Sequence, residues 1–111
     1  MIYMPDVAAL DQAVMSQVQQ CDVLLLDGTF WSNHEMQETG AGRALAEEMG
    51  HLPIGGIYGS LARIASLPMS RRIYIHINNT NPLHVAGSPE RRKVEGAGWE
   101  VAADGMEIVL C

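Results

Sequence analysis

Two apolar runs each end on a polar side chain that can bind a metal or move a proton. Asp27 follows Leu24-Leu25-Leu26, and His76 follows Ile73-Tyr74-Ile75. The carboxyl ends of neighbouring parallel strands meet at one edge of a sheet, where ligands gather. His51, in a glycine-rich loop between the two runs, is a third candidate. A carboxylate and two imidazoles suit part of a metal site, or an acid/base pair.

Each candidate also has an interpretation without chemistry. Asp27 precedes Gly28-Thr29, so its carboxylate could accept loop N–H groups in a strand-end turn. His76 could be a hydrogen-bonded core histidine, and His51 an ordinary loop residue. We interpret His34 and His84 as plain loop residues.

The elements that must position these side chains alternate along the chain, which predicts an α/β fold with a mainly parallel sheet. Strands are expected at 2–4, 23–26 and 73–75, and a terminal hairpin at 99–102 and 106–110 around Asp104-Gly105. Helices are expected from an Asp6 cap through Val18, at 43–49 with Gly50 as its cap, at 57–67, and from Ser88-Pro89 to Gly96 or Gly98.

The length and composition of the chain exclude some classes of function. A length of 111 residues predicts a single domain over 1–111. The net charge of −6 argues against a nucleic-acid partner, and the short basic clusters at 71–72 and 91–93 are interpreted as solvated surface. No apolar run is long enough to span a membrane, and the first residues lack a basic n-region, so we expect no membrane segment and no signal peptide. Cys21 and Cys111 form no framework, which favours a cytoplasmic setting.

Several segments of the chain form a set that can be compared with known families. They are IYMPDVAALD at 2–11, DGTFW at 27–31, EMGHLP at 48–53, HINNTNP at 76–82, SPERRKVEGAGWEV at 88–101 and AADGMEI at 102–108, and HINNTNP is the most specific. In this order they resemble the C-terminal part of the PqqB family, the pyrroloquinoline quinone (PQQ) biosynthesis protein B family of the metallo-β-lactamase superfamily. The resemblance covers nearly the whole chain. It implies the C-terminal half of an αββα sandwich, so the 1–111 domain would be partial.

The resemblance also implies roles for the three candidates. Asp27 matches the aspartate that bridges two metals, and His76 matches the late histidine of the second metal. His51 matches the position that faces the reacting group as a possible catalytic acid. The implied cofactor is iron or zinc. The implied activity is an oxygen-using hydroxylation of a tyrosine in a small peptide-derived Glu–Tyr precursor, within PQQ biosynthesis.

One departure from the family pattern is large. The main metal motif of the superfamily, His-x-His-x-Asp-His, does not occur in these 111 residues. Two ligands hold a metal weakly, so we expect little or no activity from this chain alone. The missing half would also leave one apolar sheet face uncovered. We therefore expect a homodimer or higher oligomer that packs through this face.

Two other function classes remain open. The chain could be a non-catalytic dimeric module for binding or carrying a small molecule, in line with an older family proposal that the cofactor or its precursor is transported. It could instead be a fragment of a metal-dependent hydrolase. A phosphate site at Gly55-Gly56 is disfavoured, because the sequence has no GxGxxG or Walker pattern.

Overall fold

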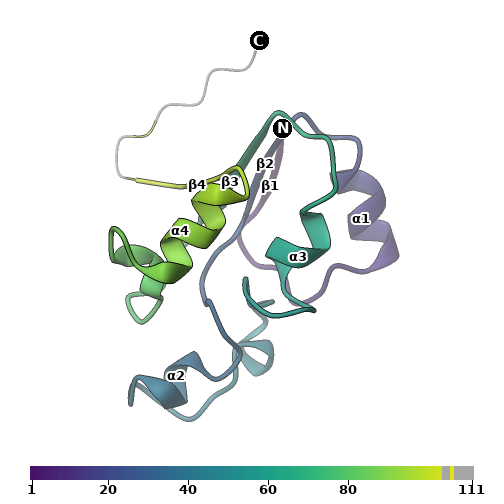
Figure 1. The fold of residues 1–111 in the computed structure, drawn as a ribbon. Helices are drawn as coiled ribbons and strands as arrows, with labels where there is room; N and C mark the ends of the chain where they lie inside the picture. Colours follow the sequence, from purple (N-terminus) through teal and green to yellow (C-terminus); the bar gives the residue numbers. More distant parts are fainter. Residues whose placement is uncertain (104–105, 107–111) are drawn as a thin grey trace.

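The sheet has four parallel strands in the order β1-β2-β3-β4. The computed structural model describes residues 1–103 and 106. The strands are β1 (Ile2–Met4), β2 (Val23–Asp27), β3 (Arg71–Ile75) and β4 (Trp99–Val101). The helices are α1 (Gln12–Val18), α2 (Glu35–Glu38), α3 (Ser60–Ile64) and α4 (Pro89–Gly96), with short 3-10 turns η1 (Glu47–Met49) and η2 (Pro82–His84). This confirms the expected α/β fold class (Figure 1).

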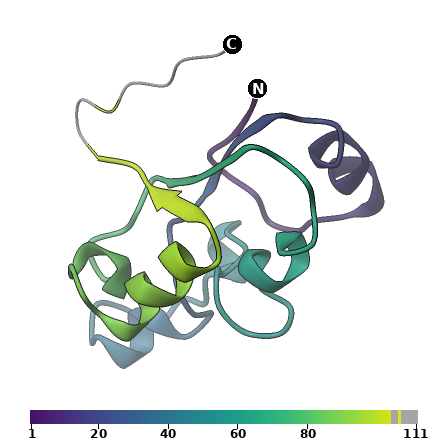
Figure 2. The same cartoon turned by 45° about the horizontal axis from the view of Figure 1, so that its top comes forward.

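The three crossover helices lie on one face of the sheet. Val18 of α1, Ile64 of α3 and Val94 of α4 belong to a single buried cluster, which also contains Leu24 and Leu26 of β2. Figure 2 shows these helices along the same side of the strands. Strands added in sequence order through right-handed crossovers produce this one-sided layering. No helix of the described residues is both long enough and apolar enough to cross a membrane.

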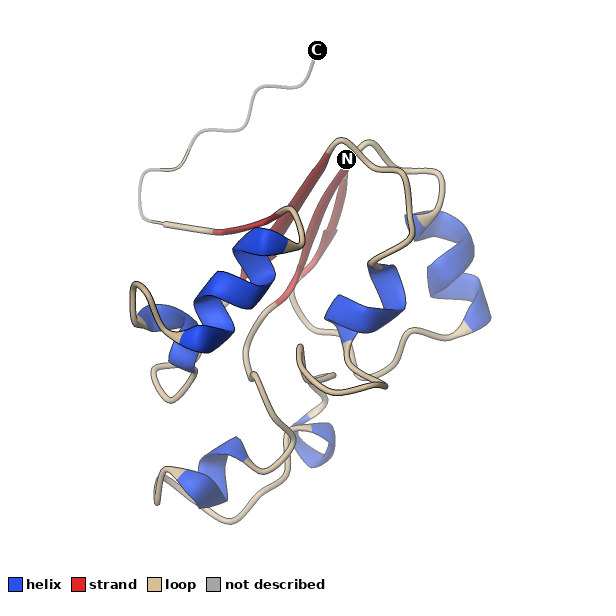
Figure 3. Ribbon diagram, in the orientation of Figure 1, coloured by secondary structure: helices blue, strands red, loops and turns tan. Residues whose placement is uncertain are grey.

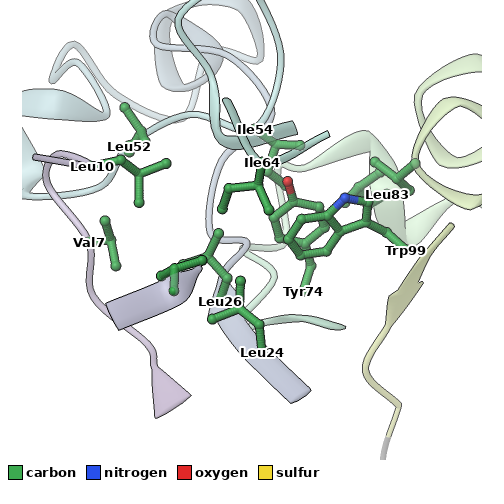
Figure 4. Close-up of a cluster of buried hydrophobic side chains, with 12 residues drawn as sticks. Val7, Leu10, Leu24, Leu26, Leu52, Ile54, Ile64, Tyr74, Leu83 and Trp99 are labelled. Atoms are coloured by element: carbon green, nitrogen blue, oxygen red, sulfur yellow. The ribbon is translucent and has the colours of Figure 1, made fainter. Parts of the chain in front are cut away.

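Tyr74 and Trp99 form the aromatic centre of this core. Their rings stack with centroids 3.9 Å apart (Figure 4). The Tyr74 hydroxyl is hydrogen-bonded to the Ser60 hydroxyl at 2.8 Å. Burial of Tyr74 raises the pKa of its phenol, so the ring stays neutral. The stack ties β3 to β4, and the hydroxyl pair ties β3 to α3.

The opposite face carries its own apolar cluster. Val23 and Leu25 of β2 pack there with Ile73 and Ile75 of β3, and none is more than 9% exposed. β2 and β3 are therefore apolar on both faces, as their continuous apolar runs predicted. At the amino end of this face, Arg71 pairs with Glu100 of β4 through two hydrogen bonds of 2.6 and 2.8 Å.

Three helix predictions were wrong in extent. α1 begins at Gln12 with Asp11 as its cap, rather than at Asp6, because the backbone of Val7 is engaged by Asp27 and Leu52. The expected helix at 43–49 is only the turn η1, with Gly50 left-handed at φ 82° as predicted. The expected helix at 57–67 is reduced to α3, because the amides of its first residues, Ser60 and Leu61, donate back to the Pro53 and Ile54 carbonyls of the preceding loop.

Two other predictions concern the end of the chain. α4 begins at Pro89, and the Ser88 hydroxyl accepts from the Arg91 amide at 3.0 Å, which confirms the predicted cap. Trp99–Val101 is a strand, but it pairs parallel with β3. The second hairpin strand at 106–110 and the Asp104-Gly105 turn lie outside the described residues.

The long connection between β2 and α3 projects beyond the carboxyl edge of the sheet. Figure 3 shows α2 and the loops around it at the opposite end of the sheet from the amino terminus. This connection carries His51, and the strand-end residues Asp27 and His76 lie at the same edge. The topology thus brings the three predicted residues to one end of the molecule.

Candidate functional site

Asp27 is the buried centre of the carboxyl edge. Its side chain is 1% exposed and accepts four hydrogen bonds. Oδ1 accepts from the Thr29 amide at 2.9 Å and the Thr29 hydroxyl at 2.7 Å. Oδ2 accepts from the Val7 amide at 3.0 Å and contacts Nδ1 of His51 at 2.7 Å. A carboxylate offers about four acceptor positions, so this set fills them.

Close packing at Gly28 fixes the direction of the chain after Asp27. A Cβ at Gly28 would lie 2.7 Å from Cδ1 of Ile77 and 2.8 Å from Cβ of Tyr74. The Gly28 amide also donates to the Ile75 carbonyl at 2.7 Å, which extends the β2–β3 pairing by one bond. Only glycine fits this position, because a side chain here would push the ends of β2 and β3 apart.

His51 is held from two sides. Nδ1 contacts the Asp27 carboxylate, and the ring of Phe30 meets the imidazole edge-on with centroids 5.8 Å apart. The side chain is 16% exposed, and Nε2 lies 3.8 Å from Oδ1 of the exposed Asp6. The contact with Asp27 occupies Nδ1, and Nε2 is the ring nitrogen that makes no hydrogen bond to a described residue. This arrangement can accept or donate a proton at Nε2.

The structure brings two of the three predicted residues into contact and leaves the third beside them. Asp27 pairs in register with Ile75, so His76 is the next residue along the neighbouring strand, as expected. His76 is exposed, so the interpretation as a core histidine is wrong. Its φ of 57° makes it the single non-glycine residue with positive φ among those described. Such strain persists where the surroundings impose it, often at ligand sites.

The metal implied by the resemblance does not fit this chain by itself. Within the described part of the chain, no three His, Cys, Asp or Glu side chains are grouped so that they could hold a metal ion. The acceptor positions of Asp27 are also taken by Val7, Thr29 and His51. A metal at Asp27 would have to displace one of these donors. In the arrangement seen here, the Asp27 carboxylate positions the imidazole of His51.

Glu35 is a buried acid of the same edge that sequence reasoning missed. It is 3% exposed, accepts from the Trp31 amide at 2.7 Å, and contacts the Thr80 hydroxyl at 2.5 Å. Burial raises the pKa of its carboxyl, partly offset by these hydrogen bonds. The carboxylate joins the loop after β2 to the loop after β3. The one available signal was the Ser32-x-x-Glu35 spacing, which is that of a capping box.

Comparison with known proteins identifies the family. The beta-lactamase superfamily domain matches residues 1–77. The chain is 44% identical to the coenzyme PQQ synthesis protein B of Klebsiella pneumoniae subsp. pneumoniae, over 99% of this chain and 36% of that protein. It is 46% identical to the coenzyme PQQ synthesis protein B of Methylococcus capsulatus, over 97% of this chain and 36% of that protein. The chain thus spans about a third of the length of these relatives.

A solved structure supports the same family. The crystal structure of Zn(2+)-bound PqqB from Methylobacterium extorquens matches with a TM-score of 0.93 and 38% identity, over 97% of this chain and 39% of that one. The expected resemblance to PqqB is therefore confirmed, and the fold is a fragment of a metallo-β-lactamase fold. The chain belongs to the beta-lactamase superfamily.

Proposed function

We propose that this chain acts in PQQ biosynthesis as part of a PqqB-like protein. Its 44–46% identity to PqqB relatives over nearly its whole length supports this assignment. Because the chain spans about a third of those proteins, the activity belongs to a protein that also contains the matching remainder. The activity implied by the resemblance is a metal-dependent oxygenation of a small peptide-derived substrate.

The observation that carries the chemical part of the proposal is the contact between Asp27 and His51. A buried carboxylate that accepts from Nδ1 fixes the tautomer and the ring orientation of a histidine. Nε2 of His51 then acts as the proton-transfer atom, and Asp27 acts as its positioning residue. The resemblance implies that Asp27 and His76 are metal ligands in the assembled protein, where a metal at Asp27 would displace one of its present donors. That role would need further ligands from outside the described residues.

A segment exchange tests the function. The matching segment of the Klebsiella relative is replaced by this chain, and PQQ production is measured in a strain that lacks PqqB. We expect the chimera to restore production, and Asp27→Ala, His51→Ala and His76→Ala each to abolish it. His34→Ala is the matched control, because His34 is an exposed histidine of the same projecting connection. An active chimera that tolerates all three substitutions would refute the assignment of the site.

Metal analysis of the isolated chain tests the ligand proposal separately. Zinc or iron(II) is added, excess metal is removed, and the bound metal is counted per chain. We expect far less than one equivalent, because the described residues offer no group of three ligands. One tightly held equivalent that is lost on His76→Ala would show that the chain forms a complete site by itself.

A second candidate function rests on the saturation of Asp27. A carboxylate whose four partners all come from its own chain suits a structural role, as in a non-catalytic binding or carrier module.

The proposed homodimer would use the sheet face that contains Val23, Leu25, Ile73 and Ile75. These side chains are already at most 9% exposed, so the new apolar contact would come from the rim around them. Light scattering during size-exclusion chromatography decides this, since a monomer at micromolar concentration excludes the dimer.

A further inference from the structure

A cavity of about 490 Å³ opens between the carboxyl ends of β3 and β4, and its residues do not include Asp27 or His51. Its apolar wall comes from Ile75, Ile77 and Leu83. This volume lies within the range of small-molecule sites, which are typically apolar with a few placed polar groups. The cavity is thus large enough for an aromatic compound of moderate size.

The polar groups of this cavity are basic or neutral. Arg91, His76 and His84 line it, and none of its lining residues within the described ranges is Asp or Glu. The whole chain carries a net charge of −6, so this local composition runs against the general charge. Charge at distances beyond about 8 Å is largely screened at physiological salt, so the local groups decide which ligand is favoured.

Arg91 has donors to spare at this position. Its Nη1 donates to the Leu83 carbonyl at 2.8 Å, which fixes the side chain against the cavity wall. Its Nε is buried and makes no hydrogen bond to a described residue, although Oε1 of Glu95 lies 3.5 Å away. Glu95 thus offsets part of the Arg91 charge from the Nε side, whereas the N–H groups of Nη2 donate to no described residue and are the donors available for a ligand. The sequence analysis interpreted Arg91 as solvated surface, but its side chain is only partly exposed and lines the cavity.

The wall around these groups is tied together by hydrogen bonds. Asn81 is 2% exposed, and its Nδ2 donates to the Gly28 carbonyl at 2.9 Å, while its Oδ1 accepts from the Leu83 amide at 3.0 Å. Nε2 of His84 lies 3.1 Å from the carbonyl of Ile77. These bonds fix η2 with His84 next to the strained backbone of His76, and Arg91 of α4 is joined to the same turn through the Leu83 carbonyl.

We propose that this cavity binds the carboxylate of a small aromatic acid, with Arg91 as the principal anion-binding side chain and His76 and His84 beside it. The apolar wall receives the ring, and the guanidinium binds the carboxylate. Arginine suits this role because its planar fork matches a carboxylate and keeps its charge at all physiological pH values. The proposal concerns binding by this chain and does not depend on a metal or on activity.

Titration of the intact chain with benzoate and isophthalate tests the proposal by NMR. We expect saturable shifts of the methyl groups of Ile75, Ile77 and Leu83, with isophthalate binding more tightly than benzoate. Benzyl alcohol supplies the ring without the charge, and inorganic phosphate supplies a charge without the ring. Both should bind at least tenfold more weakly than benzoate, because benzyl alcohol lacks the hydrogen bond between charged groups and phosphate lacks the apolar contact of the ring.

Two variants with matched controls locate the site. Arg91→Met should weaken isophthalate binding about tenfold or more, whereas Arg92→Met should not, because Arg92 does not line the cavity. His84→Ala should weaken binding severalfold, with His34→Ala as the control. Circular dichroism checks that each variant folds. The proposal is overturned if the methyl groups of the wild-type chain do not shift in about 10 mM probe, because a site with a Kd on the order of 1 mM would then be mostly occupied. It is also overturned if Arg91→Met binds as tightly as the wild type, or if benzyl alcohol matches benzoate.

Discussion

The substitution Asp27→Asn distinguishes a structural role of this carboxylate from a metal-ligand role. A structural role predicts a lower free energy of unfolding for the variant, and a ligand role predicts a higher one. Asp27 accepts from two backbone amides, one hydroxyl and one imidazole. Asparagine has one acceptor oxygen, and its NH2 group must face the donors on the other side. If the oxygen stays on Thr29, the NH2 group meets the Val7 amide and His51. His51 can change tautomer, but the Val7 amide cannot become an acceptor.

The expected loss follows from this count. A buried donor without a partner costs about 1–3 kcal/mol, and the lost charge-assisted bond adds a similar amount, so we expect a total of about 3 kcal/mol. Domains of this kind are stabilised by about 5–15 kcal/mol, so the variant should still fold. For a chain of this length, 3 kcal/mol lowers Tm by about 13 °C.

The assay is denaturant unfolding followed by circular dichroism, in a chelating buffer without added metal. Asp22→Asn is the control, because Asp22 is an exposed aspartate at the other end of the same strand. We expect Asp22→Asn to change the free energy of unfolding by less than about 0.5 kcal/mol. Asp27→Asn as stable as Asp22→Asn would refute the hydrogen-bond argument. A more stable Asp27→Asn would show that the carboxylate is held in strain for a ligand.

Two further substitutions test the surroundings of the site. Because burial raises the pKa of Glu35, its ionisation costs folding free energy, and this cost appears as pH rises from the unfolded pKa through the folded one. Glu35→Gln should therefore match the wild type in free energy of unfolding at about pH 4 and exceed it at about pH 7. The control Glu38→Gln, at an exposed position, should show no such trend. An equal difference between Glu35→Gln and the wild type at both pH values would contradict the argument. Gly28→Ala should destabilise by about 1–3 kcal/mol, since its Cβ would overlap Ile77 and Tyr74. Gly96→Ala, which meets nothing within 4 Å, should be neutral or stabilising, and equal effects of the two alanines would contradict the packing argument.

Local sequence signals predicted the elements whose ends are fixed within a few residues. Ser88-Pro89 marked the start of α4, and Gly50 marked a left-handed cap, because both depend on their own backbone and side-chain geometry. The extent of α1 was not predictable in this way. Val7 and Leu10 fit a helical pattern and are buried, but the amide of Val7 is bound by Asp27, which lies 20 residues away in the chain.

The sequence by itself determined the alternation of elements, the apolar strands, the family motifs and the three candidate residues at strand ends and loops. These follow from side-chain type and spacing, which act over a few residues. The tertiary structure alone decided that Asp27 holds His51, that Glu35 is buried, and that Arg91 lines a cavity beside His84. The Asp27–His51 and Glu35–Thr80 contacts join residues 24 and 45 positions apart, and only the closing of loops at the carboxyl edge of the sheet brings them within contact distance.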